Sequence, residues 1–111
     1  MQKLMTKELQ RKLPPLYSQD GKKAETVVYG HWFSCINGWD FYATEYDKET
    51  GDVFGFVFGM VPEMGYFNVS ELEEVNRRYG MSYFERETHF TPRKATEIPI
   101  IAEAFGYLWE K

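Results

Sequence analysis

The chain has 111 residues, which is about one ordinary domain and too few for two independent hydrophobic cores. It has no apolar run near the roughly 20 residues that a membrane-spanning helix needs, and its N-terminal segment is too polar for a signal peptide. The single cysteine, Cys35, has no partner for an internal disulfide, so we expect a cytoplasmic protein.

The net charge of -4 is concentrated in the middle of the chain. Residues 26–76 carry nine acidic side chains and one basic side chain, whereas residues 1–25 and 77–111 each carry more basic than acidic groups. This balance disfavours nucleic-acid binding by the middle segment, because a phosphate backbone needs several cations. It fits a basic partner, a cation or a solvated surface. Any nucleic-acid contact would fall instead to flanking cations such as Lys3, Lys7, Arg11, Lys12, Lys22 and Lys23.

The first 13 residues predict an amphipathic helix, because apolar side chains recur on one helical face as far as Leu13. Pro14 and Pro15 end this helix, since the residue before a proline avoids the α region. Residues 18–25 are polar and contain turn-forming residues, so they predict a loop.

Three strands are predicted next, at residues 26–33, 39–46 and 53–60. Each segment is rich in β-branched and aromatic residues and lies between turn signals. Asn37-Gly38 predicts a tight turn between the first two strands, because both residues tolerate positive φ. Simple alternation along the second strand would place Tyr46 on the face opposite Phe41.

Residues 61–67 are predicted to form a loop, and residues 70–79 a well-specified helix. Ser70 is the predicted N-cap, with Glu73 at capping-box spacing. Gly80 is expected to end the helix.

A fourth strand is predicted at residues 81–90, followed by a C-terminal helix that begins near Thr96. The expected fold is therefore α+β, with an antiparallel meander of about four strands, an N-terminal helix, a central helix and a C-terminal helix. We expect residues 1–111 to form a single domain.

Acidic side chains of the predicted hairpins are the first candidate site. If they project outward together, they form one continuous patch that attracts a basic protein surface. The predicted acidic interaction patch consists of Asp40, Glu45, Asp47, Glu49, Asp52 and Glu63.

Aromatic side chains of the same segments are the second candidate site. Exposed rings stack on bases or other ligands, whereas the alternative for the same rings is packing in the core. The predicted surface aromatics are Trp39, Tyr42, Tyr46 and Tyr66.

A small metal-dependent nuclease or hydrolase is an alternative from another class, since convergent carboxylates can hold a catalytic cation. The two histidines are 58 positions apart and lack the short spacing of zinc sites, so no metal site or cofactor is predicted. This alternative would use Asp40, Glu45, Asp47 or Glu63 with His31 or His89.

Several motifs resemble a known family in their order and spacing. They are Pro14-Pro15-Leu16-Tyr17, Gly38-Trp39-Asp40-Phe41-Tyr42, Thr44-Glu45-Tyr46-Asp47, Pro62-Glu63-Met64-Gly65-Tyr66-Phe67 and Ser70-Glu71-Leu72. Together they resemble the small bacterial domain of unknown function 2958. The resemblance covers a core of about residues 13–92 and leaves the N-terminal helix and residues 93–111 as additions. It implies a setting on plasmids, integrative elements and phages, often beside DNA-handling or anti-restriction genes, and it carries over no catalytic residue.

These observations predict a non-enzymatic binding protein of a mobile genetic element, whose acidic surface engages a basic protein partner. Counter-defence, meaning inhibition of a restriction or CRISPR-type enzyme, is one such role. The metal-dependent hydrolase and a structural dimerisation module stay open as alternatives. We expect no membrane partner.

Overall fold

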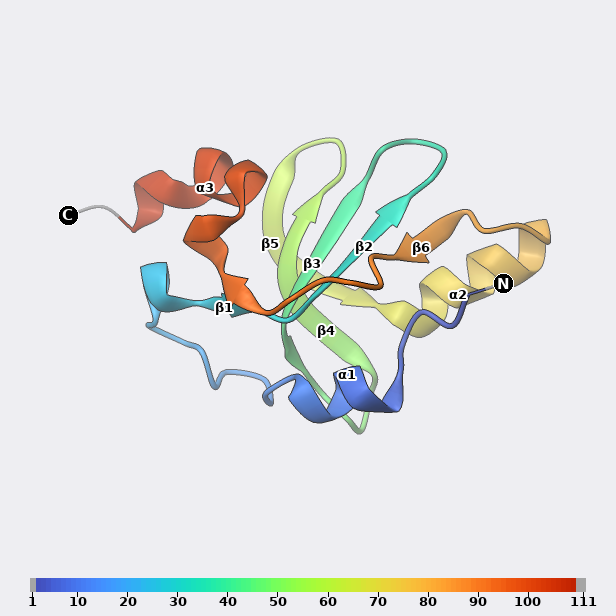
Figure 1. The fold of residues 1–111 in the computed structure, drawn as a ribbon, viewed down its shortest axis with the longest axis horizontal. Helices are drawn as coiled ribbons and strands as arrows, with labels where there is room; N and C mark the ends of the chain where they lie inside the picture. Colours follow the sequence, from blue (N-terminus) through green and yellow to red (C-terminus); the bar gives the residue numbers. More distant parts are fainter. Residues whose placement is uncertain (1, 110–111) are drawn as a thin grey trace.

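A five-stranded antiparallel sheet organises the computed structural model, which describes residues 2–109 (Figure 1). The strand order is β5-β4-β3-β2-β6, so β2 to β5 form a meander and β6 joins beside β2. The predicted α+β fold is confirmed. The strands are β2 (Gly30–Ser34), β3 (Asp40–Tyr46), β4 (Asp52–Phe58), β5 (Pro62–Asn68) and β6 (Phe84–Arg86).

Two shorter strands and the helices complete the described chain. Strands β1 (Val27–Val28) and β7 (Arg93–Lys94) pair antiparallel as a separate small sheet. The helices are α1 (Lys7–Lys12), α2 (Val69–Tyr79) and α3 (Pro99–Phe105), with short 3-10 turns at Lys23–Glu25, Ala95–Glu97 and Gly106–Leu108. Between residues 2 and 109, no helix combines the length and the apolar character needed to cross a membrane.

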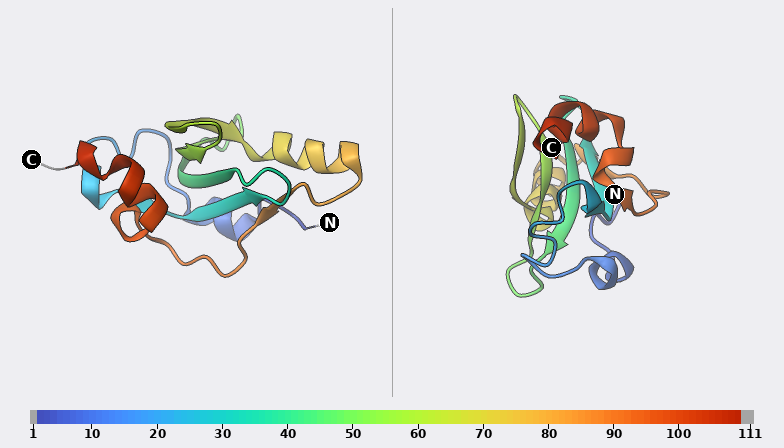
Figure 2. Two further views of the ribbon diagram at one scale, coloured as in Figure 1. Left: turned by 90° about the horizontal axis from the view of Figure 1, so that it is seen from above. Right: turned by 90° about the vertical axis from the view of Figure 1, so that its left-hand side faces the viewer.

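The sheet has a hydrophobic cluster on each face, and α2 and α3 lie toward opposite ends of the molecule (Figure 2). Phe41 belongs to the first cluster, with the fully buried Leu4 and Trp32. The next residue of β3, Tyr42, points the other way into the second cluster, which includes Phe56 and residues of α3. Both faces are therefore built from neighbouring positions of the same strands.

The N-terminal helix is shorter than predicted, because it begins at Lys7 behind a cap at Thr6. The Thr6 hydroxyl accepts a hydrogen bond from the Leu9 backbone N–H at 3.1 Å. Residues 2–5 are not helical, yet Leu4 is still buried, and its carbonyl accepts the indole N–H of Trp32 at 2.7 Å. Met1, which the prediction placed in the helix, lies outside the described residues.

Residues 61–67, predicted as a loop, are mostly strand β5. Seven residue pairs join β5 to β4, from Asp52 opposite Asn68 to Phe58 opposite Pro62. A proline in a sequence argues against a strand, which is why this strand was not predicted. Pro62 is tolerated because it is the first residue of β5, where a missing N–H costs little.

The other differences lie at strand ends. The strand predicted at 26–33 is interrupted at Tyr29, and the one predicted at 81–90 contains only β6. Instead of a two-residue turn, residues 35–39 form the loop between β2 and β3, with Gly38 at φ +78°. Helix α2 is capped by Asn68, one residue before the helix rather than at Ser70, and ends at Gly80 as predicted.

A bulge in β3 decides which side chains reach each face. The pairing with β4 shifts between Ala43 and Glu45, opposite Gly55. Tyr46 consequently joins the cluster that contains Phe41, so the face expected for it from simple alternation is wrong. A Cβ at Gly55 would lie 1.7 Å from the carbonyl oxygen of Tyr42, so the strands can approach here only because this position is glycine.

We predict that Gly55→Ala lowers the free energy of unfolding by at least about 2 kcal/mol, because the backbone of β3 must move to admit the methyl group. Gly106→Ala is the matched control. No atom lies within 4 Å of a Cβ at that position, so stability should stay within about 0.5 kcal/mol of wild type. Urea unfolding followed by tryptophan fluorescence measures both variants, and equal stabilities would contradict the close approach.

Candidate functional site

A groove with a volume of about 700 Å³ lies between the end of α1 and the turn that joins β3 to β4. Pro14, Pro15 and Tyr17 line one side, and Tyr46 and Lys48 line the other. Its volume falls in the range of roughly 300–1,000 Å³ that is common for ligand sites.

The proline wall of the groove is fixed by its bonds to β3. The carbonyl of Pro14 accepts a hydrogen bond from the backbone N–H of Tyr46 at 2.9 Å, so the segment continues beside the end of the strand. Pro14 and Pro15 also restrict their own φ angles. This side of the groove is therefore formed before any ligand arrives.

Glu45, only 4% exposed, anchors the next part of the wall. One carboxylate oxygen accepts the backbone N–H of Tyr17 at 2.8 Å, and the other accepts the backbone N–H of Gln19 at 2.9 Å. The buried Gln19 amide donates to the carbonyls of Val27 and Thr44, and its oxygen accepts the N–H of Val27. Hydrogen bonds to an ionised carboxylate are stronger than neutral ones, so this network fixes residues 17–19 on the bulged end of β3.

Tyr17 has a left-handed backbone with φ of 72°, which is unusual for a bulky residue and costs about 1–3 kcal/mol. The bond from its N–H to Glu45 helps to hold this conformation. Its ring is exposed and adjoins Tyr66 of β5. Interaction with the Tyr17 side chain, and then desolvation, raise the pKa of Tyr66. Two aromatic side chains from distant segments therefore meet beside the groove.

The rim of the groove carries both signs of charge. Arg11 and Lys12 lie on the α1 side, whereas Asp47, Lys48 and Glu49 lie on the turn side. The groove therefore has a basic edge facing an edge where acids outnumber bases, which would orient a charged ligand.

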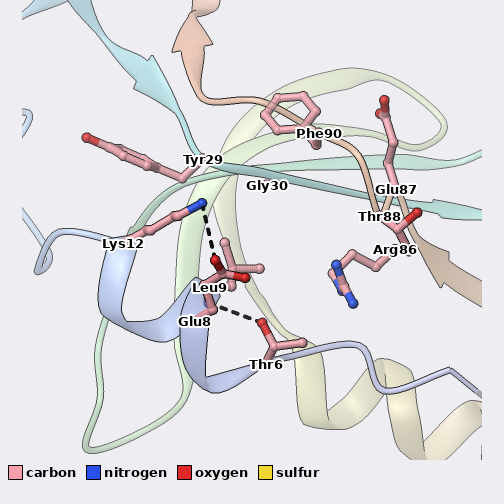
Figure 3. Close-up of a pocket in the computed structure, with 10 residues that line it drawn as sticks. All are labelled: Thr6, Glu8, Leu9, Lys12, Tyr29, Gly30, Arg86, Glu87, Thr88 and Phe90. Carbon is pink, nitrogen blue, oxygen red and sulfur yellow. Dashed lines mark hydrogen bonds and ion pairs between the residues drawn. The ribbon is translucent and has the colours of Figure 1, made fainter.

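A second hollow, between α1 and the segment after β6, has a volume of about 70 Å³ (Figure 3). Leu9 packs against Gly30, where a Cβ would lie 3.3 Å from the Leu9 side chain. This hollow has room only for a few water molecules.

The predicted acidic patch is not one continuous surface. Asp40 and Asp47 are separated by the length of β3, and Glu63 lies at the start of β5, beside the Asp40 end of the sheet. Glu45 is buried beneath residues 17–19, so its assignment to the surface is wrong: its oxygens are bonded to backbone N–H groups. The acids that the structure brings together are those of the β3–β4 turn, Asp47, Glu49 and Asp52.

The predicted surface aromatics also divide. Tyr42 and Tyr46 are 7% and 8% exposed, so their assignment to the surface is wrong; both pack in the core. Trp39 is half-buried, with its ring over Gly59, and Tyr66 is 54% exposed. Tyr17 was not among the candidates, because nothing in the residues around it predicts its left-handed backbone.

His31 lies between two carboxylates on the sheet face that carries Tyr42. Its Nε2 is 2.7 Å from Asp40 and its Nδ1 is 2.7 Å from Glu87, while its ring stacks on Tyr42 at 4.3 Å. Of the residues that the metal-dependent alternative would use, His31 and Asp40 are in hydrogen-bond contact. Glu45 is bonded instead to the backbone of Tyr17, and His89 is exposed. Across residues 2–109, no three His, Cys, Asp or Glu side chains are placed to hold a metal ion.

These features define a small α+β domain whose single main sheet carries a preformed groove at the bulged end of β3. The chain belongs to the family described as "Protein of unknown function (DUF2958)", whose model matches residues 4–104. The match takes in α1 and most of the C-terminal segment, which the sequence resemblance had left outside the core. No curated protein and no solved structure matches the chain.

We predict that the stability of the protein falls between pH 10 and pH 12 because of Tyr42. Burial, and then the negative charges of Asp40 and Glu87, raise its pKa from 10.0 to about 12. Above pH 10 the phenol ionises in the unfolded chain but stays neutral in the folded one, so unfolding is favoured by up to about 2 kcal/mol.

Urea unfolding at a series of pH values tests this. Tyr42→Phe should lose less stability than wild type over this range, whereas Tyr79→Phe, at a 61% exposed position, should follow wild type. Parallel curves for wild type and Tyr42→Phe would contradict the assignment.

Proposed function

We propose that the protein is a non-enzymatic binding protein whose groove between α1 and the β3–β4 turn receives a segment of a partner protein. The main observation in support of this proposal is the preformed groove of about 700 Å³. Its proline wall and the bonds from Glu45 to Tyr17 and Gln19 fix the backbone before binding. A site ordered in advance loses little conformational entropy when a ligand binds.

The charges and rings of the groove indicate a basic partner segment. Asp47 and Glu49 line its turn side and are accessible to a partner's Lys or Arg. Tyr17 and Leu16 offer aromatic and apolar surface for a neighbouring ring, proline or aliphatic side chain. The basic edge at Arg11 disfavours an all-cationic segment, so the expected ligand mixes basic and apolar residues.

The proposed setting is the cytoplasm of a cell that carries a mobile genetic element. The family resemblance supports this setting, and the net charge of -4 supports a basic partner such as a nucleic-acid-handling defence enzyme. Counter-defence is the role that combines a mobile-element setting with binding to such an enzyme. The binding role fits the geometry better than a metal-dependent hydrolase, because Asp40 is the only one of that alternative's carboxylates in hydrogen-bond contact with His31.

Fluorescence anisotropy with two labelled peptides tests the binding role. The peptides have equal length and the same tyrosine and proline residues, and they differ in carrying Lys and Arg or Asp and Glu. We expect the basic peptide to bind more tightly, and its affinity to fall between about 50 mM and about 500 mM salt as charges are screened.

A double substitution of the turn acids, Asp47→Asn with Glu49→Gln, should lower the affinity for the basic peptide about fivefold, because two exposed charge contacts are lost. The control, Glu71→Gln with Glu103→Gln, removes the same charge from exposed helix positions and should leave the affinity unchanged. Equal binding of the two peptides, or equal loss in both double variants, would contradict the proposal.

A further inference from the structure

Strand β5 forms one edge of the five-stranded sheet and pairs with β4 alone. In the described part of the chain, no strand covers its other edge, and the end-on view places β5 at the outer side of the molecule (Figure 2). An uncovered edge presents a row of backbone N–H and C=O groups that can pair with a further strand.

The edge at β5 has few of the features that usually prevent such pairing. It is seven residues long, its register with β4 has no bulge, and Glu63 is its only charged residue. The opposite edge, β6, has three residues and includes Glu85 and Arg86. Charges, prolines, bulges and short length are the common protections of an edge strand. By this measure β6 is well protected, whereas β5 has only Pro62 at its first position and Glu63 beside it.

Exposed apolar side chains gather on the same hairpin. Met60 is 92% exposed and Val61 60% exposed in the turn before β5, and Met64 and Tyr66 are 44% and 54% exposed on the strand itself. Grouped exposure of large apolar residues is typical of surfaces that meet a partner.

We propose that the partner is a second copy of this chain, paired antiparallel through β5 with the two-fold axis at Gly65. This register pairs all seven residues of the strand, whereas any other centre leaves some unpaired. It places Met64 opposite the partner's Tyr66, a favourable sulfur–aromatic pair. It also places Glu63 opposite the partner's Phe67, so no like charges face each other.

Gly65 suits the centre of this pairing because the two opposed copies of this residue have no side chains to crowd each other on the face of the sheet. The result is a continuous ten-stranded sheet across two protomers. A single strand edge is a small interface, so we expect a dissociation constant in the micromolar range. The dimer does not depend on the proposed groove, which lies between α1 and the β3–β4 turn.

Disulfide trapping tests the register. In a Cys35→Ser background, Gly65→Cys places two thiols at the axis, where opposed Cα atoms lie about 4.5–5.5 Å apart, within the disulfide range. A Cβ at this position lies no closer than 3.6 Å to another side chain, so the fold should tolerate it. We expect rapid covalent dimerisation, and much slower cross-linking for Cys35→Ser with Met81→Cys, where the thiol is more exposed but lies away from the β5 edge.

Sedimentation equilibrium of the wild type tests the dimer without a new thiol. We expect a reversible monomer–dimer equilibrium that Met64→Lys weakens at least tenfold, because both sulfur–aromatic pairs are lost and the two lysines lie diagonally across the axis, about 7–8 Å apart. Met81→Lys, at a position 42% exposed against 44% for Met64, should leave it unchanged. The proposal is overturned if the wild type stays monomeric at high concentration, if Met64→Lys dimerises normally, or if β5 pairs only with a strand of another protein.

Discussion

The buried carboxylate of Glu45 is the interaction on which the groove depends. It links the end of β3 to residues 17–19 through two backbone N–H groups, and it does so from a position only 4% exposed. A buried acid is costly unless its oxygens are well bonded, and here both accept hydrogen bonds. The bulge at residue 44 and the missing side chain of Gly55 put Glu45 where it can reach the loop.

The surfaces proposed for binding lie apart from the residues that stabilise the fold. Two hydrophobic clusters on opposite faces of the sheet hold β2 to β4 in place. The groove, the turn acids and the β5 edge lie around this core, where side chains can change contacts without disturbing packing. A bound partner segment and a second copy of the chain would then use different parts of one rigid sheet.

Much of the fold could be predicted because hydrophobic pattern and capping act locally. Aromatic and β-branched runs predicted the three central strands. Acidic residues at the start of α2 and Gly80 at its end predicted that helix. The site could not be predicted in the same way. The bulge in β3 reverses the side expected for Tyr46, and Glu45 looks like any acid of an exposed hairpin until residues 17–19 fold over it. The motifs of the family resemblance did contain Tyr17, Glu45 and Tyr66. Only the contacts between these distant segments show that the three side chains lie close together.

Amide hydrogen exchange at Tyr17 and Gln19 tests the central role of Glu45 most directly. If the carboxylate holds this wall, both amides should be protected nearly as well as that of Tyr46, and Glu45→Gln should expose at least one of them, because an amide oxygen replaces only one of the two acceptors. Exchange of both amides in the wild-type protein at the rate of Lys48, an exposed turn residue with no backbone hydrogen bond from its N–H within residues 2–109, would contradict the account.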